Sequence, residues 1–254
     1  MVEGKQWQPI QVLILGALVL LSFCGAVLAA EIVTRLAGPH VTPNSLTLAR
    51  MAISVLGFQG LALVWVHFFL KANQTTWSEA FGFGRHNYLK CAVAVLVTFP
   101  FVLAVVFALG AGSEWLLRQL YQQLHWPWLE PVPQSTVELL QKEWPPHLIV
   151  VQGLLAIVVA PLGEEVLFRG VLYTLLKQRG HRLAAVLLSA VLFAAIHLYP
   201  AGFLSLIFLA VVLVALYEWT GNLLAPILMH SLFNAVNFAL IVLHPKWAED
   251  LFRT

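Results

Sequence analysis

The stretch that decides the fold runs from Leu148 to Leu175 and reads LIVVQGLLAIVVAPLGEEVLFRGVLYTL. Its apolar part is long enough for a membrane-spanning helix, which needs roughly 20 mostly apolar residues. Glu164, Glu165 and Arg169 nevertheless lie within it. Ionisable residues at membrane depth are costly and mark functional sites by default, so this stretch predicts both a membrane fold and a site inside it.

The composition extends the membrane prediction to the whole chain. Of its 254 residues, 60% are hydrophobic and only 10% are charged, and the mean hydropathy is +0.85. Soluble domains carry about 25% charged residues, so a soluble protein this poor in charge could not cover its surface. The net charge of +2 gives no indication of a nucleic-acid partner. Cys24 and Cys91 lie in apolar runs and are interpreted as packing residues, not as a disulfide or a metal pair.

Further apolar stretches of similar length predict an all-α polytopic membrane protein with about seven to eight transmembrane helices. The first follows Lys5 and is longer than the apolar region of a typical signal peptide, so we expect an uncleaved anchor. The seven stretches are 10–32, 48–70, 91–112, 148–175, 183–199, 202–219 and 222–243.

The polar connection 113–147 separates two groups of these stretches. Leu117, Leu120, Tyr121 and Leu124 recur there at helical spacing between polar residues, which is typical of an amphipathic helix lying on the bilayer surface. A loop anchored by tryptophans, without a direct role, is the alternative. The expected parts are N-terminal transmembrane helices in 1–112, an interfacial amphipathic segment in 113–147, a catalytic helical core in 148–243 and a C-terminal tail in 244–254.

Basic residues between the stretches indicate an orientation. The segments 71–90 and 176–182 are the basic ones, and the positive-inside tendency places both in the cytoplasm together with the N-terminus. The brevity of the chain and the lack of an organelle address suggest the inner, cytoplasmic membrane of a bacterium.

Three short motifs place polar groups on three successive apolar stretches. Glu165 and Arg169 are four residues apart, so they share a helix face and can pair, whereas Glu164 lies about 100° away around the helix. His230 and Asn234 are one turn apart on one face. The motifs are Glu164-Glu165-x-x-x-Arg169, Phe193-x-x-x-His197 and His230-x-x-x-Asn234.

Each motif alone is compatible with a purely structural role. A glutamate near a helix end can be a solvated cap, a lone histidine can be a packing residue, and an asparagine can join helices. Three different stretches carry these groups, however, and unpaired charges cannot face lipid. The least costly arrangement points them all into one polar intramembrane cavity, which we therefore expect.

This set of groups suits the hydrolysis of an acyl bond. No serine or cysteine has an obvious basic partner, and Ser189 and Ser231 are near the motifs only in sequence, so water is the expected nucleophile. A glutamate beside a histidine can take a proton from water. The second histidine and the asparagine can donate hydrogen bonds to the developing oxyanion.

The three motifs, in this order on consecutive hydrophobic segments, resemble those of the CPBP family over roughly residues 148–243. These are intramembrane endopeptidases that include the CAAX prenyl proteases and bacteriocin-processing or self-immunity relatives. The resemblance implies a metal-independent glutamate protease without a cofactor. In it, Glu164 is the general base, His197 helps to activate the water, and His230 with Asn234 stabilises the oxyanion.

The same resemblance assigns a supporting role and a class of partner. Glu165 and Arg169 match the positions that brace the site. Members act on peptide bonds near the membrane, in prenylated C-terminal tails or in small peptides. The expected partners are therefore a membrane-associated peptide or protein and the lipid bilayer.

Two alternatives belong to other classes of protein. A zinc-dependent membrane hydrolase is the first, because Glu, His and His are acceptable zinc ligands, although no His-Glu-x-x-His helix is present. A non-enzymatic transporter or scaffold subunit is the second, since transporters also use intramembrane Glu and His. No repeated halves of the kind found in transporters are visible.

Overall fold

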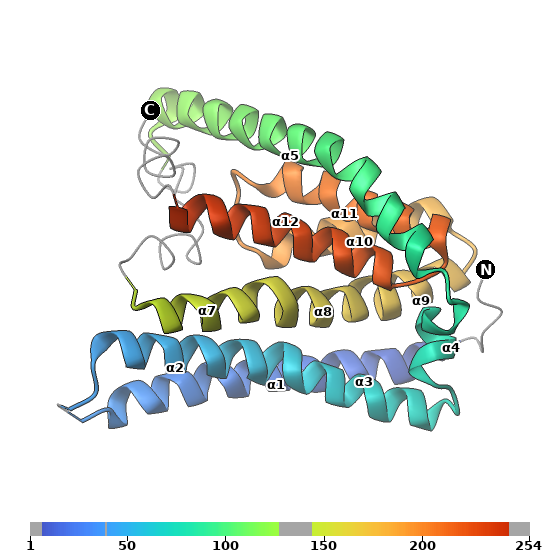
Figure 1. Ribbon diagram of the computed structural model, residues 1–254, viewed down its shortest axis with the longest axis horizontal. Helices are drawn as coiled ribbons and strands as arrows, with labels where there is room; N and C mark the ends of the chain where they lie inside the picture. Colours follow the sequence, from blue (N-terminus) through green and yellow to red (C-terminus); the bar gives the residue numbers. More distant parts are fainter. Residues whose placement is uncertain (1–6, 39, 127–143, 244–254) are drawn as a thin grey trace.

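The computed structural model describes residues 7–38, 40–126 and 144–243, which fold into helices (Figure 1). Each of the seven predicted stretches holds one apolar helix, so the prediction of an all-α polytopic membrane protein is confirmed. One of the seven, Arg182–Ile196, is shorter than the others. The six that are long and apolar enough to cross a membrane are Pro9–Leu36, Pro43–Ala72, Tyr88–Leu124, Pro146–Gln178, Phe203–Thr220 and Leu224–Leu243.

The N-terminal part contains two antiparallel spans and a third, longer one. The second span is interrupted by a π-helical turn, η1, which joins α2 to α3. A short α-helix and a 3₁₀ turn then lead into the third span, α5. The elements are α1 (Pro9–Leu36), α2 (Pro43–Val55), η1 (Leu56–Gly60), α3 (Leu61–Ala72), α4 (Trp77–Phe81), η2 (Phe83–Arg85) and α5 (Tyr88–Leu124).

The C-terminal part begins with a continuous helical run from Pro146 to Gln178, in which π-helical turns alternate with α-helix. Three further helices follow, connected by short loops. The elements are α7 (Pro146–Leu154), η4 (Leu155–Val159), α8 (Ala160–Glu165), η5 (Val166–Tyr173), α9 (Thr174–Gln178), α10 (Arg182–Ile196), α11 (Phe203–Thr220) and α12 (Leu224–Leu243).

Local sequence signals explain where several helices begin and end. Prolines open α1, α2 and α7, at the first helical position, where the missing N–H costs nothing. Thr76 and Glu79 form a reciprocal capping box that starts α4. Gly221 ends α11 with a φ of +66°, in the left-handed region that glycine adopts without strain.

The run α7–α9 lies between two groups of helices (Figure 1). On one side, α1, α2 and α3 pack together, and η1 contacts α8. On the other side, α12 contacts η4 and α8, and α10 contacts η5, while α5 packs on α11 and α12. The run that carries Glu164 is therefore covered from both sides, which places this carboxylate inside the protein.

A buried joint between the two parts fixes the start of α12. Asn222 is fully buried and donates to the Oδ1 of Asn87, while the amide of Asn87 donates to the carbonyl of Thr220. The backbone N–H of Leu223 donates to the carbonyl of Phe81. Because His230 is carried by α12, this joint also helps to set the position of the site.

The segment 113–147 differs in part from its expected form. Residues 113–124 continue α5 as one helix, so the helical spacing of their leucines belongs to an extension of this span. Residues 127–143 lie outside the described part of the chain. The expected boundary between 112 and 113 thus falls inside α5, and an interfacial position of this segment stays a prediction.

The basic segments lie at one end of the molecule. Lys177, in the last turn of α9, and Arg182, at the start of α10, both pair with Glu218 near the end of α11. The backbone N–H of Trp7, just before α1, donates to Gln178. This end faces the cytoplasm in the predicted orientation.

Candidate active site

A buried ion cluster joins α8, η5 and α12. The Oε1 of Glu165 accepts from the Nη1 of Arg169 at 2.8 Å and lies 2.8 Å from the Nδ1 of His230. Glu165 is 0% exposed, Arg169 1% and His230 4%. Buried charges need partners of this kind, so the predicted pairing of Glu165 with Arg169 is confirmed.

Glu164 lies beside this cluster, in a different environment. Its Oε2 is 3.9 Å from the Nε2 of His197 and 3.9 Å from the Nε2 of His230. Both distances exceed hydrogen-bond length, so neither ring is bonded directly to this carboxylate oxygen. This oxygen is buried and makes no hydrogen bond within the described part of the chain. The structure thus brings Glu164, His197 and His230 together.

Phe193 organises the two imidazoles and the arginine. Its carbonyl is 2.7 Å from the Nδ1 of His197, one helical turn later. Its ring centroid lies 4.7 Å from that of His197 and 5.8 Å from that of His230. The guanidinium of Arg169 stacks over the same ring, 4.4 Å from the centroid. The Phe193-x-x-x-His197 motif therefore supplies the packing surface as well as the histidine.

Asn234 lies one turn after His230 on α12. Its Nδ2 donates to the carbonyl of Ala156 at 2.8 Å, in the π-helical turn η4. A carboxamide nitrogen carries two hydrogens, so one N–H of Asn234 is not used by this bond. The neighbouring Asn237 donates to Phe233 on its own helix.

α10 ends at Ile196, and a loop follows its C-cap residue, His197. Leu198 follows with a φ of +49°, and its side chain is 88% exposed. Burial, with a smaller contribution from the Glu114 carboxylate, raises the pKa of Tyr199 to about 12. The phenol of Tyr199 therefore stays neutral at physiological pH.

The other nucleophile and metal-site candidates from the sequence are not part of the cluster around Glu164 and Glu165. The hydroxyl of Ser189 donates to the carbonyl of Val186 on its own helix. Within residues 7–38, 40–126 and 144–243, no group of three His, Cys, Asp or Glu side chains is arranged to hold a metal ion. The zinc alternative thus finds no support in the geometry.

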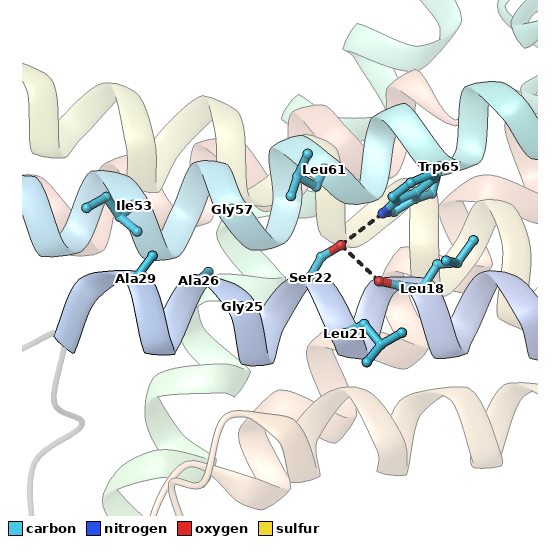
Figure 2. A pocket seen from close by; sticks show the side chains of 10 residues that line it. All are labelled: Leu18, Leu21, Ser22, Gly25, Ala26, Ala29, Ile53, Gly57, Leu61 and Trp65. Atoms are coloured by element: carbon cyan, nitrogen blue, oxygen red, sulfur yellow. Dashed lines mark hydrogen bonds between the residues drawn. The ribbon is translucent and has the colours of Figure 1, made fainter. Parts of the chain in front are cut away.

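An apolar groove of about 490 Å³ lies elsewhere, between α1 and the α2–α3 span (Figure 2). It is lined by small residues such as Gly25 and Gly57, together with Leu61. At one end, the Nε1 of Trp65 donates to the Oγ of Ser22 at 2.9 Å. None of the predicted site residues lines this groove.

One residue near Glu164 had no signal in the sequence. Gln59 belongs to η1, in the span 48–70, which was predicted only as a membrane helix. Its side chain packs against Gly163, where an added Cβ would lie 2.6 Å from the Cβ of Gln59. The N-terminal helices therefore reach the residue that precedes Glu164.

Comparison with protein families agrees with the motifs. Residues 145–236 match the family described as type II CAAX prenyl endopeptidase Rce1-like. No curated protein and no solved structure matches the chain. The matched segment contains all three motifs and the whole buried cluster. The protein is thus an integral membrane protein, and its residues 145–236 are similar to the type II CAAX prenyl endopeptidases.

Proposed function

We propose that this protein is an intramembrane endopeptidase that hydrolyses a peptide bond with a water molecule activated by Glu164 and His197. The observation that carries the proposal is the position of the Glu164 Oε2, which lies 3.9 Å from two imidazole Nε2 atoms and makes no hydrogen bond with the residues that the structure describes. Carboxylates that are paired only for structure engage their partners directly, as Glu165 does. A water between Glu164 and His197 could give its proton to the carboxylate.

The hydrogen bonds of the His197 and His230 rings determine which ring nitrogens remain available for the reaction. The carbonyl of Phe193 can only accept, so the Nδ1 of His197 carries a hydrogen and the Nε2 of the neutral ring keeps its lone pair. Glu165, paired with Arg169, is an acceptor for the Nδ1 of His230 in the same way. Both rings thus turn their Nε2 atoms toward Glu164.

The reaction follows from these positions. The water oxygen attacks the scissile carbonyl carbon while its proton passes to Glu164, and a tetrahedral oxyanion forms. Protonated at Nε2, His230 donates a hydrogen bond to the oxyanion, and Glu165 stabilises the imidazolium charge. The second N–H of Asn234 is the other donor. Glu164 then returns the proton to the leaving nitrogen and the C–N bond breaks, which yields a carboxylic acid and an amine that leave as carboxylate and ammonium.

Glu165 and Arg169 hold the ring of His230 in place. The guanidinium of Arg169 also donates to the carbonyl of Ala210 at 3.3 Å, which connects the cluster to α11. A ring fixed on one side by a buried carboxylate needs no reorganisation when charge develops on the other side. The pair is therefore proposed as the support of the site, not as a reacting group.

The substrate is proposed from the family and from the membrane setting. The family's printed name specifies CAAX prenyl endopeptidases, so a prenylated C-terminal tail of a membrane-associated protein is the first substrate to test. We place the protein in the inner membrane of a bacterium, with its basic end in the cytoplasm. The chemistry is proposed to need neither a metal nor an organic cofactor.

The test is cleavage of a defined peptide by the full chain purified in detergent. The probe, here called the tail peptide, is a fluorescence-quenched peptide that ends in an S-farnesylated CAAX sequence, and mass spectrometry identifies the cleaved bond. We expect turnover by the native protein, with and without a chelator, and none by Glu164→Ala, His197→Ala or His230→Ala. Undiminished turnover by Glu164→Ala contradicts the mechanism, and loss of turnover with a chelator, restored by zinc, supports a zinc hydrolase instead.

A further inference from the structure

Gln59, in η1, is a buried glutamine that packs against Gly163 of α8. The residue is 8% exposed, and its Oε1 is buried and makes no hydrogen bond within the described residues. Most buried side-chain polar atoms are hydrogen-bonded, because leaving one unpaired costs its full desolvation. A leucine at this position would avoid that cost in an apolar helix pair. The unpaired Oε1 of Gln59 is therefore available to accept a hydrogen bond from a bound group.

The position of Gln59 is tightly fixed from two sides. An added Cβ on Gly163 of α8 would lie 2.6 Å from the Cβ and 3.2 Å from the Cα of Gln59. On the opposite side of η1, a Cβ on Gly57 would lie 2.6 Å from the Cβ of Ala26 in α1. Figure 2 shows Gly57 facing α1 in the apolar groove, which Gln59 does not line. η1 is thus held between α1 and α8, with Gln59 on the α8 side.

The contact between Gln59 and Gly163 lies next to the proposed general base, Glu164. Gly163 precedes Glu164, whose Oε2 is also buried without a hydrogen bond in the described part of the chain. Each of the two contacting elements, η1 and α8, therefore carries a buried acceptor that has no hydrogen bond among the described residues, and both acceptors are open to the donors of a bound group. A carboxamide both donates and accepts, which matches the C=O and N–H of a peptide group.

We propose that Gln59 binds the backbone of the substrate peptide next to the scissile bond. This inference rests on the proposed function, and it makes the N-terminal helices, outside the matched segment, part of the substrate site. The carboxamide of Gln59 should bind the peptide equally strongly in the ground state and in the transition state of the reaction. Its loss should therefore raise KM and leave kcat nearly unchanged.

The experiment measures cleavage of the tail peptide and thermal unfolding of the same purified samples. Gln59→Leu removes the carboxamide at similar volume, and Gln59→Met is a second apolar variant. Gln152→Leu is the matched control, because Gln152 is 1% exposed, has both polar side-chain atoms unpaired within the described residues, and lies in the same helical run twelve positions before Glu164. For each variant, KM, kcat and Tm are compared with those of the native chain.

We expect Gln59→Leu and Gln59→Met to keep or raise Tm while KM rises about tenfold, the effect of losing one hydrogen bond to substrate. Gln152→Leu should also keep or raise Tm, with an unchanged KM. An unchanged KM in both Gln59 variants, or a lower Tm in both, overturns the inference, since the carboxamide would then be idle or structural. Failure of the proposed function is distinguishable, because the native chain itself would not cleave the tail peptide.

Discussion

At the scale of single residues, two adjacent glutamates have opposite environments. Glu165 is fully buried, and its Oε1 contacts both Arg169 and His230 at 2.8 Å. One oxygen of Glu164 lies 3.9 Å from the Nε2 of His197 and has no hydrogen bond among the described residues. This difference between neighbours underlies the proposed roles, in which Glu164 reacts and Glu165 supports the site.

The spacing of the residues predicted only part of this arrangement. Residues four apart meet on a helix, so the pairing of Glu165 with Arg169 could be predicted from the sequence. The contact between Glu165 and His230 could not, because 65 positions separate them and only the packing of α12 on α8 brings them together. The bond from Asn234 to Ala156 spans 78 positions and was missed for the same reason.

The ion pair of Glu165 and Arg169 makes a quantitative prediction. Arg169→Met should lower the free energy of unfolding by about 3–5 kcal/mol, because Glu165 would keep its charge in a buried site without the guanidinium. The measurement is denaturant-induced unfolding in detergent. Arg35→Met is the control, since Arg35 also pairs with a glutamate four positions away but its side chain is 77% exposed. That variant should change stability by no more than about 1 kcal/mol, and equal losses in both would contradict the account.

At the scale of elements, π-helical turns interrupt two of the spans next to the site. η1 carries Gln59, η4 supplies the carbonyl that binds Asn234, and η5 carries Arg169. Such turns are frequent at functional sites. The apolar stretches predicted the helices that contain these π-helical turns. An apolar stretch does not indicate, however, where an α-helix widens into a π-helical turn. The extension of α5 to Leu124 was likewise not expected.

The contact between η1 and α8 predicts the effect of a single methyl group. Gly163→Ala should lower the free energy of unfolding by about 1–3 kcal/mol, because the new Cβ would overlap the Cβ and Cγ of Gln59. It should also reduce cleavage, since the same helix carries Glu164. Thermal unfolding and turnover of the tail peptide measure the two effects.

The control for this substitution is Gly16→Ala in α1. Nothing lies within 4 Å of a Cβ at Gly16, so alanine should there stabilise the helix by about 0.5–1 kcal/mol. If Gly163→Ala were as stable and as active as Gly16→Ala, the close packing of η1 on α8 would be wrong.

At the scale of the whole molecule, the all-α membrane class and the positions of the seven apolar stretches could be predicted, but the arrangement of the helices could not. Length and hydropathy predicted the seven apolar stretches, because the bilayer sets the length of a span. Which helices enclose the run α7–α9 depends on side-chain packing between distant segments, for which hydropathy carries no information. The N-terminal helices had no motif, and their contact with α8 became evident only in the fold.

The orientation of the molecule is a further prediction at this scale. The basic end, with Lys177, Arg179 and Arg182, should face the cytoplasm under the positive-inside tendency. The first test variant carries Arg179→Cys and lacks the native cysteines. Its cysteine should react with a membrane-impermeant maleimide in inverted membranes or opened cells, and not in intact cells. A cysteine at His147, at the other end of the run α7–α9, should react in intact spheroplasts, and the reverse pattern would contradict the orientation.

The central claim is that the carboxylate of Glu164 takes the proton from water while Glu165 serves as the support. The most direct measurement compares turnover and Tm of Glu164→Gln and Glu165→Gln, both of similar size to the native residue, on the tail peptide. Glu164→Gln should lose at least about 100-fold in kcat, the effect of removing a general base, with a Tm within about 2 °C of the native chain. Glu165→Gln should lose Tm and turnover together, because Arg169 and His230 would lose their shared acceptor. A Glu164→Gln variant that cleaves at the native rate would contradict the claim.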